Sequence, residues 1–232
     1  MTNNKVQIKV KQRCNKIDSN DYDNLESWVI QEAMNKAQTE FCRRQLHGGN
    51  QYREGAEQSI RRIDDLQQLL TPYKLTGEST SIYFESTNLP KDYFEFNKVI
   101  IQGTKDKCTV DGFKVFLTEE SNTEVLLSDE NYKPSFDWRE TFCTLINNKV
   151  RIYTNGEFIL KEPKLIYYRQ PKEIKFLGTI NLDTGENNTI EQECEFKTDI
   201  VELIVDEAAA IITGDLESIQ TQRLSAQAER NN

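Results

Sequence analysis

Histidine is almost absent from this chain, and most familiar active-site chemistry is absent with it. The 232 residues include a single histidine, His47, which lies beside two glycines in a predicted surface turn. Without a second histidine, a thiol paired with a histidine or a G-x-S-x-G elbow, no nucleophilic triad can be assembled. The sequence supplies no acid, base and nucleophile set, and we therefore expect a protein that is not an enzyme.

Phosphate-binding and metal-binding motifs are missing as well. There is no GxxxxGK[ST] or GxGxxG loop, so nothing predicts a phosphate cradle. The cysteines are odd in number and far apart, and no CxxC or Cys/His cluster suits zinc or a disulfide framework. We expect no cofactor, no metal, and reduced thiols that are mostly buried. The cysteines are Cys14, Cys42, Cys108, Cys143 and Cys194.

Long apolar runs are also missing. None approaches the roughly 18–20 residues that span a bilayer, and the N-terminal segment lacks the apolar core of a signal peptide. We therefore expect no membrane partner and a protein made and kept in a cytoplasm. Basic residues are fewer than acidic ones, with 29 Lys and Arg against 38 Asp and Glu. Because basic side chains drive nucleic-acid binding, this acidic balance predicts no tight grip on DNA.

The charge is unevenly placed along the chain. Residues 1–16 hold five basic residues and no acid, whereas residues 183–207 are acidic, with Lys197 the only basic residue. Both runs are typical of a solvated surface. Glu202 and Asp206, four residues apart, share one face of a predicted helix. Such a pair more often meets a Lys or Arg of a neighbouring element than performs catalysis.

Apolar residues recur at helical spacing twice in the N-terminal third. The first stripe runs from Leu25 to Phe41 and includes Trp28. It is followed by the turn signal of residues 47–50, so a helix should end there. The second stripe runs from Ala56 to Leu70, and Pro72 is expected to stop it. These patterns predict two helices joined by a short Gly-rich turn.

A third stripe gives the most regular helix pattern in the chain. It comprises Ile200, Val201, Ile204, Val205, Ala208, Ile211 and Ile212. Ile204 and Ile211 are expected on its buried face, because they follow the i, i+4, i+7 spacing. Gly214 is expected to interrupt this helix. A weaker helix is predicted from Asp215 to Arg230, poorly ordered in the free subunit.

Between about residues 79 and 171 the apolar period changes from helical to two, which predicts short strands separated by turns. The segment from Thr141 to Tyr168 predicts three successive strands joined by two hairpins. Asn147-Asn148 would form the first turn and Asn155-Gly156 the second, since both pairs tolerate the positive φ of a type I′ turn.

These patterns predict the α+β class, with a helical bundle built from N- and C-terminal helices and an antiparallel β module inserted between them. The expected parts are a polar basic arm at 1–19, a helical pair at 20–76, the β module at 77–175, a loop at 176–196, and C-terminal helices and tail at 197–232 that pack with the helical pair.

Aromatic residues are plentiful in the predicted β module, and core filling explains most of them. The cluster from Tyr132 to Trp138 is harder to bury, because it lies in a loop that contains Pro134. Tyrosine and tryptophan on loops are favoured in protein interfaces. Two interpretations of Tyr132, Phe136 and Trp138 therefore stand side by side, an interface with a partner and the edge of the core.

The order of several short motifs resembles a family of phage proteins. The motifs are Asp64 to Leu70, Leu89-Pro90-Lys91-Asp92-Tyr93, Ile152 to Gly156, Leu165 to Pro171, and the helix from Asp199 to Asp215. This succession, over roughly residues 22–216, resembles the head–tail connector adaptors of podovirus-type phages. That family includes the tubular tail protein A and ring proteins of crAss-like phages.

The resemblance implies a structural ring subunit in the virion, assembled in the host cytoplasm. Such a homo-oligomer, usually dodecameric, docks beneath the portal protein and links it to the next tail or ring protein. Genomic DNA passes non-specifically through its channel during genome ejection, and an acidic lining lets like charges slide past. The resemblance also implies portal docking through the C-terminal segment, where the apolar anchors are Leu216, Ile219 and Leu224. Tyr132, Phe136 and Trp138 would then contact the tail or a neighbouring subunit.

Two other functions fit the same residues. The chain could be another virion component, such as a different tail ring or a head-completion protein. It could also be a β-module protein-binding domain unrelated to phages. Ring formation and binding to a portal separate the connector from the unrelated binding domain.

Overall fold

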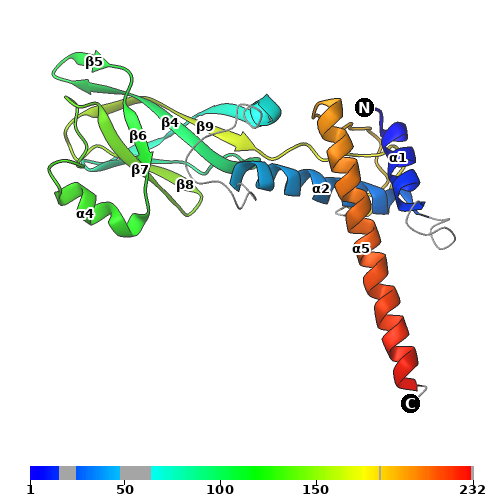
Figure 1. Cartoon of the computed structure of the whole chain (residues 1–232). Helices are drawn as coiled ribbons and strands as arrows, with labels where there is room; N and C mark the ends of the chain where they lie inside the picture. The colour runs from blue at the N-terminus through cyan, green and yellow to red at the C-terminus, as the bar shows by residue number, and fades with distance from the viewer. Residues whose placement is uncertain (16–24, 48–63, 183, 231–232) are drawn as a thin grey trace. The chain divides into compact units, whose positions relative to one another are not determined.

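The computed structural model describes residues 1–15, 25–47, 64–182 and 184–230 (Figure 1). The chain divides into two compact units, and each is treated by itself below. The helical unit comprises Met1–Gln68 with Pro171–Asn232, and the β unit comprises Leu69–Gln170. Helices and two sheets are both present, so the predicted α+β class is confirmed.

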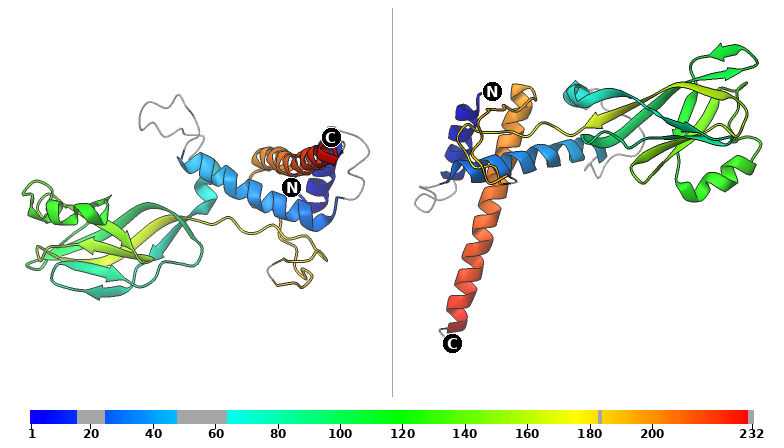
Figure 2. Two further views of the ribbon diagram at one scale, coloured as in Figure 1. Left: turned by 90° about the horizontal axis from the view of Figure 1, so that it is seen from below. Right: turned by 180° about the vertical axis from the view of Figure 1, so that it is seen from behind.

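Three helices dominate the helical unit. They are α1 (Asn3–Asn15), α2 (Ser27–His47) and α5 (Thr198–Arg230). The helix α5 contacts both α1 and α2, and Figure 2 shows it crossing α2. Their shared core is lined by aliphatic side chains, together with an edge-on contact between the Phe41 and Phe196 rings at 5.8 Å.

The predicted polar arm is wrong for residues 3–15, which form α1 instead. Val6, Val10 and Cys14 are at most 1% exposed, and their four-residue spacing places them on one face of the helix. The buried stripe consists of only three residues, and most of the other residues of this segment are polar. Its composition therefore indicated a solvated surface. This helix is held by tertiary packing rather than by a rich apolar pattern.

The helix α2 is described from Ser27 to His47, and residues 48–50, where the sequence predicted the break, lie outside the described residues. The later part of the predicted stripe is buried as expected, whereas Trp28 is 37% exposed and Ile30, which the stripe did not include, is fully buried. The buried residues on this helix include Ile30, Ala33, Met34, Ala37 and Phe41.

The helix α5 passes through Gly214 without a break, which corrects the predicted interruption. A glycine inside a helix costs about 1 kcal/mol relative to alanine, which by itself is too little to end a helix. Ile204 is fully buried as predicted. Ile211, which was also predicted to be buried, is only half-buried. The neighbouring Ile212 is buried instead.

Most of the predicted second helix, Ala56 to Leu70, lies outside the described residues. Its end is a 3-10 turn, η1 (Gln67–Leu69), which leads directly into strand β1 (Leu70–Lys74). Pro72 therefore lies in a strand and does not stop a helix. Because β1 is at the edge of its sheet, a residue without an N–H is tolerated there. The β unit begins at Leu69, earlier than the expected residue 77, and ends at Gln170 rather than 175.

The β unit contains two sheets. One has the order β1-β9-β4-β5, and the other has the order β2-β3-β8-β7-β6. All paired strands are antiparallel except β6 and β7, which are parallel. The remaining bounds are β2 Gly77–Ser79, β3 Tyr83–Ser86, β4 Tyr93–Lys105, β5 Cys108–Val110, β6 Lys114–Leu117, η2 Glu120–Asn122, α4 Thr123–Ser128, β7 Glu140–Ile146, β8 Lys149–Tyr153 and β9 Ile159–Arg169.

One of the two predicted hairpins is present and the other is wrong. Asn147 and Asn148 have φ of 48° and 59° and join β7 to β8 in an antiparallel pair. Asn155 and Gly156 also have positive φ, but they lead from β8 into β9, which belongs to the other sheet. The local turn chemistry was predicted correctly. The long-range pairing of β9 with β4 and β1 decides where the chain goes next.

The two sheets share one apolar core. Val99, Ile101 and Leu165 from the first sheet meet Val150 and Ile152 from the second. In this core the Phe113 ring lies directly over the backbone of β4. A Cβ added at Gly103 would stand 2.5 Å from that ring, so this glycine permits the close approach.

Candidate functional site

An apolar groove of about 610 Å³ lies beside the edge strand β6 of the five-stranded sheet. We call it the β-unit groove. Its apolar walls are Phe116, Leu117, Leu126, Tyr132, Pro134 and Trp138. Large apolar side chains gathered around a concave surface mark binding sites far more often than single exposed ones do.

The loop from 129 to 139 forms one wall of this groove and is fixed by its own hydrogen bonds. The Asp129 carbonyl accepts from the N–H groups of Tyr132 and Lys133, at 3.2 and 2.9 Å. The Ser135 hydroxyl accepts from the N–H of Trp138 at 3.3 Å. These bonds hold Tyr132 and Trp138 in place while their rings stay in solvent.

The structure separates the three predicted interface residues. Tyr132 is 66% exposed and Trp138 is 82% exposed, and both line the groove. Phe136 packs against the core instead, with ring centroids 6.2 Å from Phe113 and 6.4 Å from Phe158. For Phe136 the structure favours the second interpretation, the edge of the core, and two of the three candidates remain available to a partner.

Sequence reasoning missed the opposite wall, formed by β6. The pattern indicated a strand in which Val115 and Leu117 alternate with polar residues. The structure leaves Phe116 56% and Leu117 47% exposed. The available signal was the Val-Phe-Leu run in a short strand, but only the sheet order shows that this strand is an edge.

A second surface is built by the segment 171–196, which we call the held loop. Its residues 176–196 were predicted as a loop, and the described part of the segment forms no helix and only two isolated antiparallel bridges, Lys175 with Gln192 and Ile180 with Asn187. Three amide side chains of α2, at i, i+4 and i+7, bind its backbone. Gln31 accepts from the N–H of Phe176 at 2.9 Å, Asn35 accepts from that of Ile174 at 2.8 Å, and Gln38 donates to the Lys172 carbonyl at 2.9 Å.

Further contacts fix the held loop on the helical unit. Asn188 donates to the Gln31 side chain at 3.0 Å, and Asn3 of α1 donates to the Lys175 carbonyl at 3.0 Å. Ile174 and Phe176 are each 1% exposed. Side-chain amides thus supply the partners that a helix or a sheet would otherwise give to buried backbone groups.

The held loop nevertheless presents large aliphatic side chains to solvent. Leu177 is 66%, Ile180 48%, Leu182 55% and Ile190 73% exposed. A loop that is anchored by buried residues and tipped with exposed aliphatic ones is unusual for a surface with no partner. We call these four residues the loop tips.

Two basic residues of α1, Lys9 and Arg13, form ion pairs within the helical unit. Glu202 accepts from Lys9 and, at 2.9 Å, from Arg13, and Arg13 also pairs with Asp206. These hydrogen bonds hold the pKa of Glu202 below its usual value. The acidic pair singled out in the sequence is therefore bound to basic partners on a neighbouring helix.

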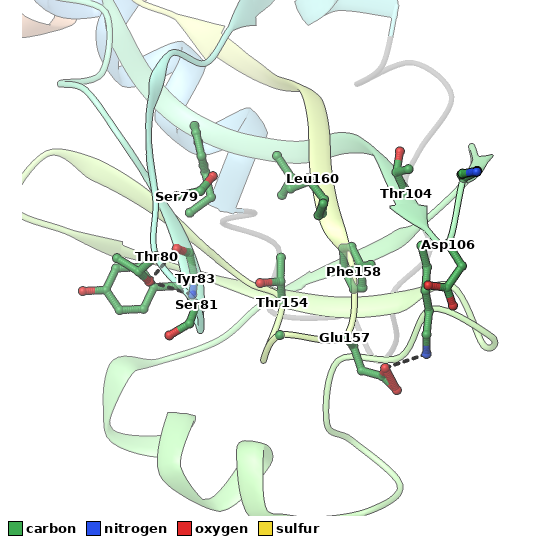
Figure 3. Close-up of a pocket in the computed structure, with 15 residues that line it drawn as sticks. Ser79, Thr80, Ser81, Tyr83, Thr104, Asp106, Thr154, Glu157, Phe158 and Leu160 are labelled. Atoms are coloured by element: carbon green, nitrogen blue, oxygen red, sulfur yellow. Dashed lines mark hydrogen bonds and ion pairs between the residues drawn. The ribbon is translucent and has the colours of Figure 1, made fainter.

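A second cavity, of about 400 Å³, lies at one end of the β unit and is lined by several hydroxyl groups (Figure 3). Thr80 donates to the Tyr83 carbonyl at 2.8 Å and Thr154 to the Ile82 carbonyl at 3.3 Å. Lys105 pairs with Glu157 at 2.8 Å, and this contact raises the pKa of Lys105. These polar groups are bonded to other protein groups, so they do not point to a ligand for this cavity.

Four of the five cysteines are buried, as predicted for most of them, and Cys108 is exposed. Burial raises the pKa of the Cys42 and Cys143 thiols to about 12, which leaves them poor nucleophiles. The described residues bring together no group of three or more His, Cys, Asp or Glu suited to a metal ion. Within the described ranges, every helix falls short of the length and apolarity that a bilayer crossing requires.

The proposed portal anchors Leu216, Ile219 and Leu224 lie on the continuous helix α5. Their side chains fall outside the described part of the structure.

No model of a known protein family matches this chain, and no curated protein matches it.

Proposed function

We propose that this protein is a structural ring subunit of a phage head–tail connector, which docks beneath the portal and links it to the tail. One observation carries the proposal. Tyr132 and Trp138 stand 66% and 82% exposed over the β-unit groove. Exposed aromatic side chains beside an apolar groove are typical of a protein interface, which is the kind of site that a ring subunit needs.

In this proposal α1, α2 and α5 form one bundle that faces the portal, and the β unit is inserted into it and faces the next tail protein. Genomic DNA passes through the ring without being gripped. Two features support the DNA channel. The net charge is −9, and Lys9 and Arg13 are paired with Glu202, so they are not available to phosphates.

The test mixes the purified chain with the portal protein encoded in the same genome. Electron microscopy is expected to show a ring of this chain seated on the portal ring. Deleting 216–232 should leave the subunit folded and abolish portal binding, because α5 is proposed to dock through that segment. A full chain that neither forms rings nor binds the portal at high concentration contradicts the proposal.

A further inference from the structure

We infer that the β-unit groove of one copy receives the loop tips of a second copy of the same chain. This inference rests on the proposed function, because it names the contact that would close the ring. It joins two surfaces that lie on different units: the groove on the β unit, and the four aliphatic loop tips on the helical unit.

The two surfaces have the same apolar chemistry. The groove is concave and walled by apolar side chains such as Phe116 and Trp138. The loop tips project from a segment whose own core residues, Ile174 and Phe176, are buried. Apolar side chains that fill an apolar groove are removed from water together, which is the main favourable term in association.

The held loop is already ordered before it meets a partner. Gln31, Asn35 and Gln38 fix its backbone through hydrogen bonds of 2.8 to 2.9 Å. A preorganised loop loses little conformational entropy on docking, so more of the interaction energy is retained as affinity. This rigidity separates the held loop from an ordinary exposed loop with a few apolar residues.

The combined area is enough for a specific interface. Phe116, Leu117, Tyr132 and Trp138 are on average about three-fifths exposed, and so are the four loop tips. With roughly 200 Å² for each fully exposed side chain, the two surfaces present on the order of 1,000 Å², the area that a specific interface needs to bury. Either surface alone would fall short.

The charges around the two surfaces are complementary at one point. Glu130, Glu140 and Glu157 line the groove. Glu140 and Glu157 are paired with Lys114 and Lys105, and Glu130 is exposed. Lys133 is exposed at the groove, and among the described residues no carboxylate is in ion-pair contact with it. Glu191, next to the loop tip Ile190, is also exposed and can supply that carboxylate.

The pairing is heterologous, because the groove and the loop tips are different surfaces. An assembly built through this contact has a free groove at one end and free loop tips at the other. The same contact can therefore add further copies until the two ends meet and close a ring. A two-fold dimer would use the same surface on both copies and would stop at two. The inferred contact is therefore of the kind that a ring requires.

The test uses one variant on each surface and then mixes them. Trp138→Ala alters only the groove, and Ile190→Ser alters only the loop. Both side chains are more than 70% exposed, so both variants should unfold at the wild-type midpoint. Ile8→Ser, at a 57% exposed position on α1, is the matched control and should assemble like the wild type. Sizes are measured by analytical ultracentrifugation over a range of concentrations.

The wild type is expected to form oligomers larger than a dimer. Each variant alone should lose association by roughly tenfold or more, since truncating a central interface residue has that effect. The mixture should form dimers and nothing larger, because the loop of the Trp138→Ala copy fits the groove of the Ile190→Ser copy. The resulting dimer has only impaired surfaces left to extend it.

The outcomes separate this inference from the proposed function. Wild-type oligomers that persist in both variants overturn the groove-and-loop contact and leave the ring proposal standing. A mixture in which both variants remain monomeric also overturns the contact. A wild-type chain that stays monomeric, alone and with the portal, overturns both.

Discussion

The helical unit and the β unit differ in which groups form hydrogen bonds with their buried backbone. In the β unit the partners come from the ladders of two sheets, and the core between the sheets is apolar. In the helical unit the helices satisfy themselves, and the held loop combines two isolated antiparallel bridges with side-chain hydrogen bonds from Gln31, Asn35 and Gln38. Single polar side chains therefore matter more in the helical unit than in the β unit.

The units also differ in how they expose apolar surface. The β unit presents it in the groove beside an edge strand. The helical unit presents it on the loop tips. Each unit carries one tryptophan, Trp28 on α2 and Trp138 at the groove, so single-tryptophan variants report on one unit at a time. The predictions below use this to test the comparison.

The largest effect is expected from Ile204→Ala in the helical unit. Ile204 is fully buried, and truncating a buried isoleucine lowers the free energy of unfolding by about 2–5 kcal/mol. The matched control is Leu203→Ala, at a 50% exposed position on the same helix, which should change it by at most about 0.5 kcal/mol. Urea unfolding followed by Trp28 fluorescence in a Trp138→Phe background checks both. Equal effects of the two substitutions would show that α5 is not packed on this face.

Gln31→Ala is expected to loosen the held loop. It removes the acceptor for the N–H of Phe176 and for the side chain of Asn188. A buried donor left without a partner costs about 1–3 kcal/mol. Amide hydrogen exchange should therefore accelerate between residues 172 and 192 and stay unchanged in the β unit.

The control for this variant is Lys36→Ala, at an exposed position of the same helix. It should leave exchange in the held loop as it is in the wild type. Exchange that rises equally in both variants would mean that the amides do not hold the loop.

Gly103→Ala and Gly214→Ala are expected to have opposite signs. At Gly103 the added Cβ would lie 2.5 Å from the Phe113 ring and 3.2 Å from Phe158, and overpacking of this kind costs about 1–3 kcal/mol. At Gly214, inside α5, an added Cβ would meet no atom within 4 Å apart from the helix's own backbone. Alanine should therefore stabilise the helix by up to about 1 kcal/mol. Thermal unfolding of each variant measures the sign. Two destabilising substitutions would mean that Gly214 meets a neighbour.

The smallest effect is expected from Glu202→Gln at acid pH. Because Lys9 and Arg13 lower the folded-state pKa of Glu202, its contribution to stability is present above the unfolded pKa of about 4.3. That contribution is lost as the pH falls through the lower folded-state value. The side chain is 31% exposed, so the contribution is at most about 1 kcal/mol.

Stability of the helical unit, followed by Trp28 fluorescence between about pH 6 and 3, checks this prediction. The Glu202→Gln variant should be less stable than the wild type at pH 6 and should lose less as the pH falls. Glu186→Gln, which removes an exposed carboxylate that the held loop does not use in the inferred contact, is the matched control and should follow the wild type.

Much of the local structure could be predicted from the amino-acid sequence. The α+β class, the burial of Ile204 and the positive φ of Asn147 and Asn148 all follow from spacing and turn chemistry. These features depend on residues close together in the chain, so their periodicity and backbone preferences are sufficient to predict them.

Only the tertiary structure decided the contacts between distant residues. It placed β9 in the other sheet, Pro72 in an edge strand, Phe136 in the core and the arm at 3–15 in a packed helix. It also brought Phe116 of β6 beside Trp138, and Gln31 beside Phe176. In each case the structure of the segment depends on residues far away in the sequence. Burial against these residues and hydrogen bonds with them outweigh the weak conformational preference of the local segment.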